Sequence, residues 1–304
     1  MSMATAFQLV PGALRTAPTL RLILASALTL SFILVLVLGP SANKSHATSM
    51  FGTLRKPGDP ALIAGHRGDR SAAPENTLPA LQSALDGSMV YVETDIRLSA
   101  DGVPVLIHDS TVDRTTNGSG PVSSLTLAEL EELDAGSWYA KAYAGLRIPT
   151  LDSFLGLLAA SDKKALLELK GEWTEAALAS VTLLIESHGL GRRVVLASFH
   201  VDTLAAMQNA APDLPRLVII RDLPDDPVAL VLEYGAIGVV TSPPAVEEDP
   251  TVVDRIHRAG LGILLYTLNQ EQNWQSALGL GVDGIITDKP SALDAWLAAT
   301  TPGT

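Results

Sequence analysis

Short runs rich in Val, Ile and Leu alternate with longer amphipathic segments along the chain from residue 61 onward. Such runs predict strands that are buried on both faces, and the segments between them have the pattern of covering helices. The expected strands are 61–65, 90–96, 165–169, 194–198, 216–220, 236–241, 262–267 and 283–287. The expected helices lie near 77–86, 151–161, 173–188, 202–210, 226–234, 247–259, 271–279 and 291–299. Eight such pairs predict an α/β fold of the closed (β/α)8 TIM barrel type over residues 61–300. A doubly wound open sheet is less suitable, because no glycine-rich dinucleotide fingerprint follows the first strand.

One more apolar run, 103–107, follows the second expected strand after a link of four residues, Ser99–Gly102. A parallel crossover needs a dozen or more residues, so this link predicts a hairpin. With Asp101 and Gly102 at the turn, Asp95 would lie opposite His108. Residues 110–150 then form an insertion after the second strand, and loops of this length are usually functional. We expect a small lid-like subdomain over the barrel mouth.

The N-terminal 47 residues have the layout of an export element. The uncharged run 22–38 follows Arg15 and Arg21, and a polar stretch with small residues leads to Ala47. This pattern is typical of a signal peptide cut after Ala47 or of an uncleaved signal anchor, and both interpretations remain open. Either one predicts an extracytoplasmic body that is secreted or held at the membrane by its N-terminal segment. Residues 48–60 are expected to be a linker.

The chain has 304 residues with a formal net charge of −12, from 21 Lys and Arg against 33 Asp and Glu. This balance argues against nucleic acid as a partner, because binders of the phosphate backbone are usually basic. The absence of cysteine excludes disulfides, zinc–thiolate sites and iron–sulfur clusters. The length fits a monomeric body, but such barrels also dimerise through their helices, so the oligomeric state stays open.

Several ionisable side chains fall at the expected C-terminal strand ends, where barrel enzymes keep their active sites. They are His66, Arg67, Glu93, Asp95, His108, Glu168 and Lys170. The two-residue period of a strand points both carboxylates of Glu93-x-Asp95 to the same face, and likewise Glu168 and Lys170. The strand-end position therefore predicts that these groups converge.

The chemistry of this set indicates metal-assisted phosphoryl transfer. Three carboxylates without thiolates form a hard, oxygen-rich site that suits Ca²⁺ or Mg²⁺. His66 and His108 could share proton transfer, while Arg67 and Lys170 could hold phosphate oxygens. An amidohydrolase-type site is disfavoured, because it would need an H-x-H pair on the first strand and none is present. An enolase-type site is disfavoured as well, because it would take its carboxylates from successive strands, whereas Glu93 and Asp95 share one.

The stretch GHRGDRSAAPENT resembles the H-R-G…P-E-N-T signature of the glycerophosphodiester phosphodiesterase family, whose barrels are similar to those of phosphatidylinositol-specific phospholipases. Further motifs follow in the family's order: VETDIRLSADGVPVLIHDSTVDRTTNGSG, LLELKG, LASFH, YTLN and GVDGIITDKP. The resemblance covers about residues 61–296, nearly all of the expected body.

This resemblance implies a hydrolase that converts glycerophosphodiesters to an alcohol and glycerol 3-phosphate with a divalent metal, Ca²⁺ or Mg²⁺. It implies that the metal is held by Glu93, Asp95 and Glu168. By the same motifs His66 and His108 form the acid–base pair, and Arg67 and Lys170 bind the phosphate. Glu75 and Asn76, in the PENT segment, are expected to support the site.

Two alternatives remain beside this interpretation. The enzyme could act as a lysophospholipase D on lysolipids, which a membrane anchor would bring close. A catalytically silent barrel that binds phosphodiesters or polyols at the cell surface is the alternative from another class. In each case the expected partner is a small molecule, with membrane contact only through the N-terminal segment if that segment is not removed.

Overall fold

The structure, a computed structural model, describes Ala47 and residues 50–300. The apolar run 22–38, on which the signal or anchor interpretation rests, lies outside these residues. Within the described part of the chain, no helix combines the length and the apolar character that a membrane crossing requires.

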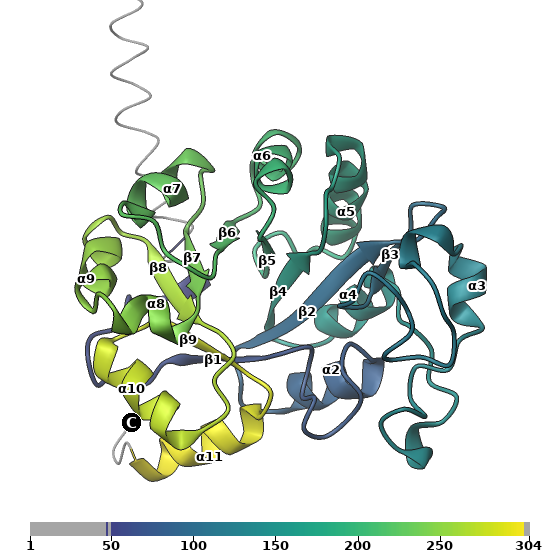
Figure 1. Ribbon diagram of the computed structural model, residues 1–304, viewed down its shortest axis with the longest axis horizontal. Helices are drawn as coiled ribbons and strands as arrows, with labels where there is room; N and C mark the ends of the chain where they lie inside the picture. The colour runs from purple at the N-terminus through teal and green to yellow at the C-terminus, as the bar shows by residue number, and fades with distance from the viewer. Residues whose placement is uncertain (1–46, 48–49, 301–304) are drawn as a thin grey trace, which may run out of the picture. The chain divides into compact units, whose positions relative to one another are not determined.

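Eight parallel strands form a closed barrel, because the last strand of the chain pairs with the first and the first also pairs with the second. The strands are β1 (Leu62–Gly65), β2 (Tyr91–Leu98), β4 (Lys164–Leu169), β5 (Val194–Ser198), β6 (Arg216–Ile219), β7 (Gly238–Thr241), β8 (Gly262–Leu265) and β9 (Gly284–Thr287). In Figure 1 the helices surround these strands. The predicted TIM barrel is therefore confirmed.

The helices cover the barrel with their apolar faces, as the alternating pattern predicts. They are α2 (Leu78–Asp86), α4 (Leu151–Ala159), α5 (Glu175–Ser187), α6 (Val201–Ala210), α7 (Pro227–Glu233), α8 (Pro243–Glu247), α9 (Thr251–Arg258), α10 (Glu271–Leu280) and α11 (Pro290–Thr300). The helix expected near 247–259 is interrupted, because Pro250 has no N–H to continue α8 and instead stands at the N-cap of α9.

The lower end of the barrel, at the N-terminal ends of its strands, is filled by the segment that precedes β1. Met50 and Phe51 are 1% and 3% exposed and belong to the apolar cluster inside the barrel. The Met50 carbonyl accepts hydrogen bonds from Tyr91 Oη and from Lys164 Nζ, the latter at 2.9 Å. Part of the stretch assigned from its composition to a linker thus packs into the core.

Replacing Phe51 with alanine is expected to lower the free energy of unfolding by about 3–5 kcal/mol, since a buried ring leaves a cavity. Thermal or urea unfolding measures this loss. Leu183→Ala on α5 is the matched control, because Leu183 is 66% exposed and its truncation opens no cavity. Equal stability of the Phe51 and Leu183 variants would contradict the assignment of Phe51 to the core.

The hairpin after β2 forms as predicted, but its register differs by one residue. Strand β3 (Pro104–Leu106) runs antiparallel to β2, with Ile96 opposite Leu106. Gly102 adopts a left-handed φ of 80°, and Ser99 N donates to the Val103 carbonyl across a three-residue loop. The extra loop residue places Ile107, not His108, beside Asp95, whose carbonyl accepts from Ile107 N at 3.1 Å.

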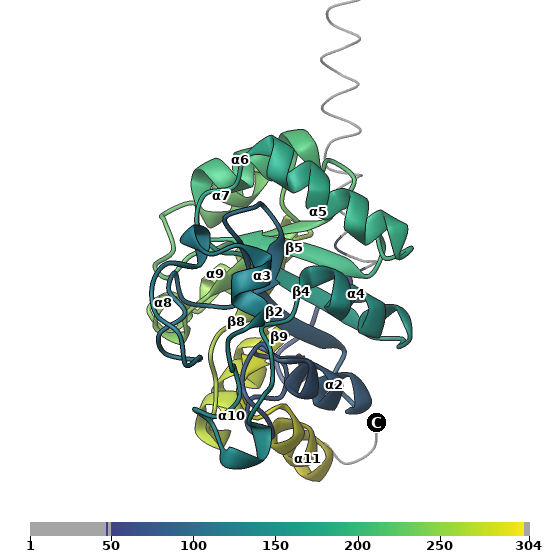
Figure 2. The ribbon, with the colours of Figure 1, turned by 90° about the vertical axis from the view of Figure 1, so that its right-hand side faces the viewer.

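The insertion between β3 and α4 has a small apolar core of its own, built around Val112, Val122 and Leu130. It contains the 3-10 helices η1 (Val122–Ser124) and η2 (Lys141–Tyr143) and the helix α3 (Leu127–Glu131). Figure 2 shows α3 on the face toward the viewer. The hydroxyls of Tyr139 and Tyr143 donate to the carbonyls of Ser71 and Ala72, at 3.1 and 2.7 Å. These bonds fix the insertion against the β1–α2 loop, at one side of the mouth.

Candidate active site

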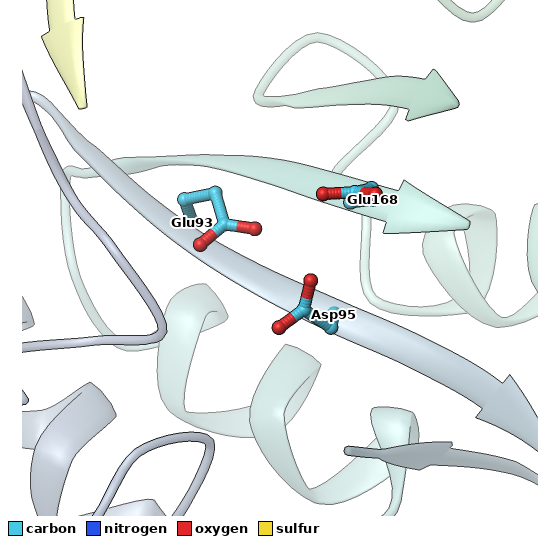
Figure 3. Close-up of side chains that lie close together, drawn as sticks. All are labelled: Glu93, Asp95 and Glu168. Carbon is cyan, nitrogen blue, oxygen red and sulfur yellow. The ribbon is translucent and has the colours of Figure 1, made fainter. Parts of the chain in front are cut away.

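Three buried carboxylates converge inside the C-terminal end of the barrel. Glu93 and Asp95 project from β2, and Glu168 projects from the adjacent strand β4, where it is the register partner of Asp95. Their ligand oxygens lie within 4.8 Å of one another, and Figure 3 shows the three carboxylates grouped together. The two-residue period therefore brings together the groups that the sequence predicted.

Two cations lie against this triad. Lys170 Nζ is 3.1 Å from Asp95 Oδ1 and 2.6 Å from Glu168 Oε1, while Arg67 Nε is 3.1 Å from Asp95 Oδ2. Burial acts to raise the pKa of Asp95, but Lys170 and Arg67 outweigh it and hold that pKa below its usual range. Asp95 is thus the carboxylate that the two cations keep ionised.

The other two carboxylates are not compensated in this way. Burial, with the nearby Asp95 and Glu168 charges, raises the pKa of Glu93 well above its ordinary value. Burial and Asp95 likewise raise the pKa of Glu168 to about 7, despite the contact with Lys170. The site therefore places three carboxyl groups beside two cations, and full ionisation of Glu93 and Glu168 is unfavourable without a further positive charge.

A divalent metal fits this donor set. Asp95 Oδ1 and Glu168 Oε1 are buried without a directed hydrogen bond, although Lys170 stands close to both. All three predicted ligands offer carboxylate oxygens, which hard cations such as Ca²⁺ and Mg²⁺ prefer. Three carboxylates face only Arg67 and Lys170, so a divalent cation would favour ionisation of Glu93 and Glu168.

The loop after β1 positions Arg67 through an unusual backbone conformation. Arg67 has a φ of 56°, which is rare for a residue with a side chain, and its N–H donates to Glu93 Oε2 at 2.8 Å. The next residue, Gly68, has a φ of 82°, and a Cβ there would lie 2.5 Å from the Ala80 carbonyl carbon. The order His-Arg-Gly therefore places the cation of Arg67 beside the triad. The next position must be glycine, because α2 packs directly against its backbone.

Asn76 supports the triad directly. It also adopts a left-handed backbone, with a φ of 54°, which asparagine tolerates better than most residues. Its side chain donates from Nδ2 to Asp95 Oδ2 at 2.9 Å and accepts from Thr94 Oγ1 at 2.7 Å. Thr77 stands at the N-cap of α2, but its hydroxyl donates to the Pro74 carbonyl rather than capping the helix.

His66 lines the same cavity as Glu93 and Glu168. Its Nδ1 lies 2.6 Å from Oδ1 of Asp288, the residue that follows β9. Asp288 is held in turn by Asn269, whose Nδ2 donates to Oδ2 at 2.7 Å. Burial lowers the pKa of His66, and the Asp288 hydrogen bond opposes that shift only in part. This pairing favours the tautomer that carries the proton on Nδ1 and leaves Nε2 free.

His108 has a similar arrangement at the end of the hairpin. Its Nδ1 lies 2.7 Å from Asp109 Oδ1, and burial lowers its pKa although the Asp95 charge acts in the opposite sense. Arg97 Nε donates to the His108 carbonyl at 2.9 Å and fixes the backbone. Each of the two predicted histidines thus has a carboxylate within hydrogen-bonding distance of its Nδ1 atom.

Apolar side chains line much of the cavity beside the triad. The cavity beside His66 is also lined by Leu166, Phe199, Ile219, Val240, Tyr266 and Ile286. The Phe199 and Tyr266 rings meet edge to face with centroids 5.9 Å apart, and Phe199 is 41% exposed. Lys170 Nζ lies 5.8 Å from the Phe199 ring centroid. A substrate at the triad would therefore meet charged groups together with an apolar wall formed by these residues.

Some residues of the site were not singled out from the sequence. Asp288 carries the same signal as His66, a polar residue directly after an apolar strand, and could have been found in the TDKP motif. Arg70 and Arg114 lie in loops with no periodic pattern, so nothing local indicated their contacts with the site. The structure brings all nine predicted residues to this end of the barrel, with Glu75 held by Arg67 Nη1 at 2.6 Å.

Comparison with known proteins agrees with this geometry. Residues 66–292 match the glycerophosphoryl diester phosphodiesterase family. A putative glycerophosphodiester phosphodiesterase of Bacillus subtilis is 34% identical over 234 residues, which is 75% of this chain and 94% of the relative. A glycerophosphodiester phosphodiesterase of Caldanaerobacter subterraneus is 32% identical over 234 residues, with 76% and 96% covered.

A solved structure has the same fold and a related sequence. The Oleispira antarctica phosphodiesterase, in complex with its product sn-glycerol-3-phosphate, superposes with a TM-score of 0.73 at 29% identity. The match covers 77% of this chain and 95% of that protein. The sequence motifs, the closed barrel, the buried carboxylate triad and the match over most of the chain agree, and the chain is a member of the glycerophosphoryl diester phosphodiesterase family.

Proposed function

We propose that this phosphodiesterase hydrolyses glycerophosphodiesters to an alcohol and glycerol 3-phosphate, with a divalent metal at Glu93, Asp95 and Glu168. The observation that carries the proposal is the buried triad, in which three carboxylates meet beside two cations. The product complex of the Oleispira relative supports the choice of glycerol 3-phosphate. Ca²⁺ and Mg²⁺ both suit three carboxylate ligands.

When bound, the metal would supply Lewis-acid polarisation of the phosphoryl group and offset its charge. Arg67 and Lys170 would bind the remaining non-bridging oxygens, since both are donor-only cations beside Asp95. Their position also lets the substrate's phosphate replace part of the interaction that each now makes with a carboxylate. The apolar wall would pack against the carbon atoms of the substrate.

His66 and His108 would transfer the protons. One takes a proton from the nucleophile, either water or the glycerol 2-hydroxyl, and the other donates one to the departing alkoxide. Asp288 and Asp109 hold the Nδ1 atoms, so the Nε2 atoms are the ones available to the substrate. The two imidazoles exchange acid and base roles if a cyclic intermediate is opened by water.

The direct test is release of glycerol 3-phosphate from glycerophosphocholine by the purified full chain. We expect activity with added Ca²⁺ or Mg²⁺ and its loss with EDTA, because the triad is the site that a chelator empties. A chain that is active only on lysophosphatidylcholine would favour the lysophospholipase D alternative. Val201, 54% exposed at the start of α6 beside Phe199, is the observation that favours such a substrate. No release from either substrate with any metal would contradict the proposed function.

The pH dependence of kcat/KM should reflect the lowered pKa values of both histidines. A base is active when unprotonated, so the acidic limb should lie below pH 6.5, the ordinary value for His. If His66 is the base, Asp288→Asn removes an interaction that raises the pKa of His66 and moves this limb to still lower pH. An acidic limb above pH 6.5 would exclude both histidines in this environment as the base.

The location of the enzyme is part of the same proposal. The run 22–38 with Arg15 and Arg21 before it supports an extracytoplasmic body, anchored or released by cleavage after Ala47. N-terminal sequencing of the protein from membrane and soluble fractions distinguishes the two forms. A body accessible to protease only after lysis would contradict an extracytoplasmic location.

A further inference from the structure

The two histidines are connected, Nδ1 to Nδ1, by a continuous series of carboxylates and arginines of alternating charge. In order, its members are His66, Asp288, Arg70, Glu75, Arg114, Asp109 and His108. Each step is an ion pair or hydrogen bond of 3.3 Å or less.

On the His66 side, the series joins the two ends of the barrel's closing seam. Arg70 belongs to the loop after β1, and Asp288 follows β9. Arg70 Nη1 lies 3.3 Å from Asp288 Oδ1, the same oxygen that holds His66, and Arg70 Nη2 lies 2.9 Å from Glu75 Oε2. Arg70 therefore links Glu75 to the Asp288 oxygen that holds His66, while Asn269 donates to the other oxygen of Asp288.

On the His108 side, the series joins the insertion to the hairpin. Arg114 donates from both Nη atoms to Glu75, at 2.6 and 3.0 Å, and from Nε to Asp109 Oδ2 at 2.7 Å. A planar guanidinium that binds two carboxylates at once fixes their relative orientation. Because Asp109 Oδ1 holds His108, this imidazole also depends on the position of Glu75.

Glu75 is the member that both sides share. Its side chain is 2% exposed, and it contacts Arg67, Arg70 and Arg114. Burial acts to raise its pKa, but these three cations outweigh burial and lower that pKa. A carboxylate shared by two arginines cannot be reoriented toward one of them without changing its contact with the other.

We propose that Glu75 is a positioning residue that couples the orientation of His66 to that of His108, acting through Arg70 and Arg114. This inference rests on the proposed function and adds that the acid and the base are aligned together rather than separately. Replacing either Arg70 or Arg114 should then misalign both imidazoles. Replacing the second arginine as well should lower the activity little further.

A double-mutant cycle on the full chain tests the coupling. Arg70→Gln and Arg114→Gln should each lower kcat for glycerophosphocholine by about tenfold or more, with KM changed much less. The double variant should lose far less than the product of the two factors, and Glu75→Gln should reproduce its loss. Arg147→Gln is the matched control, because Arg147 is an exposed insertion arginine that donates to the Glu132 carbonyl.

Chemical rescue keeps the test decisive if a buried variant is unstable. Arg114 has 42% of its side chain exposed, so free guanidinium at sub-denaturing concentration can reach its place in Arg114→Ala. We expect rescue of kcat in Arg114→Ala and none when Glu75→Gln is also present. As a readout besides activity, the ¹⁵N shifts of the His66 ring should change in Arg114→Ala, although Arg114 does not contact that ring.

The outcomes separate this inference from the proposed function. The coupling would be overturned if the wild type is active, the two arginine variants lower kcat by independent factors that multiply, and the ¹⁵N shifts of His66 do not change in Arg114→Ala. The phosphodiesterase activity would then still stand. A wild type without activity on any glycerophosphodiester would overturn the proposed function, while the ¹⁵N shifts would still report on the coupling.

Discussion

His66→Gln is expected to lower kcat for glycerol 3-phosphate release by about 10²- to 10⁴-fold, because glutamine cannot exchange a proton with substrate. Gln keeps a polar side chain beside Asp288 at a partly buried position, so the fold should persist. Steady-state kinetics with saturating metal measures the change, and His108→Gln should show a loss of the same order.

His188→Gln provides the control for this prediction. His188 also pairs with a carboxylate, since its Nε2 lies 2.9 Å from Asp152 Oδ1, but the pair joins α4 to the end of α5, away from the triad. Its replacement should leave kcat unchanged. Full activity of His66→Gln would remove His66 from the proton-transfer scheme.

Asp95→Asn and Glu93→Gln should change the stability of the metal-free protein in opposite directions. Asp95 contacts both Lys170 and Arg67, so the Asn variant removes one charged partner from each buried cation and should lose about 3–5 kcal/mol. In a protein of this size such a loss lowers Tm by on the order of 10 °C. Glu93→Gln removes a carboxyl that is costly to ionise and should raise Tm.

The sign follows from proton linkage. A carboxyl with a raised pKa binds more protons in the folded state than in the unfolded state, so stability falls as pH rises between the two values. For Glu168 this window runs from 4.5 to about 7, and Glu93 acts in the same direction. The gain from Glu93→Gln should therefore be larger at pH 8 than at pH 5.

Scanning calorimetry with EDTA and with added Ca²⁺ or Mg²⁺ measures both effects. Metal should raise Tm of the wild type, and neither variant should retain that increase in full, because each has lost a ligand. A metal-dependent increase that survives unchanged in both variants would place the metal elsewhere. Destabilisation by Glu93→Gln would contradict the charge balance described above.

Local sequence patterns predicted the barrel and the triad for identifiable reasons. Buried parallel strands need uninterrupted apolar residues, so polar residues such as Glu93, Asp95 and Glu168 within them are conspicuous. The period of two then places Glu93 and Asp95 on one face, and β4 follows β2 in the barrel because the hairpin strand lies outside it.

The contacts that the sequence did not reveal are set by tertiary structure. Phe51 lies in a short segment with two Gly and two Pro among residues 48–60, so nothing local distinguishes a segment that fills the barrel from a linker. The hairpin register depends on the left-handed Gly102, which adds one residue to the loop. Arg114 and Glu75 are 39 residues apart, and only the folded insertion brings them together.

The barrel's closing seam also determines when the active site exists during folding. His66 and Asp288 are separated by 222 positions, and the β1–β9 pairing that brings them together joins the two ends of the body. Contacts of such long range form late, since the entropy of closing the intervening chain must first be overcome. A nascent or truncated chain without β9 lacks the carboxylate partner of its first histidine. Hydrolytic competence is therefore expected only after β9 has paired with β1.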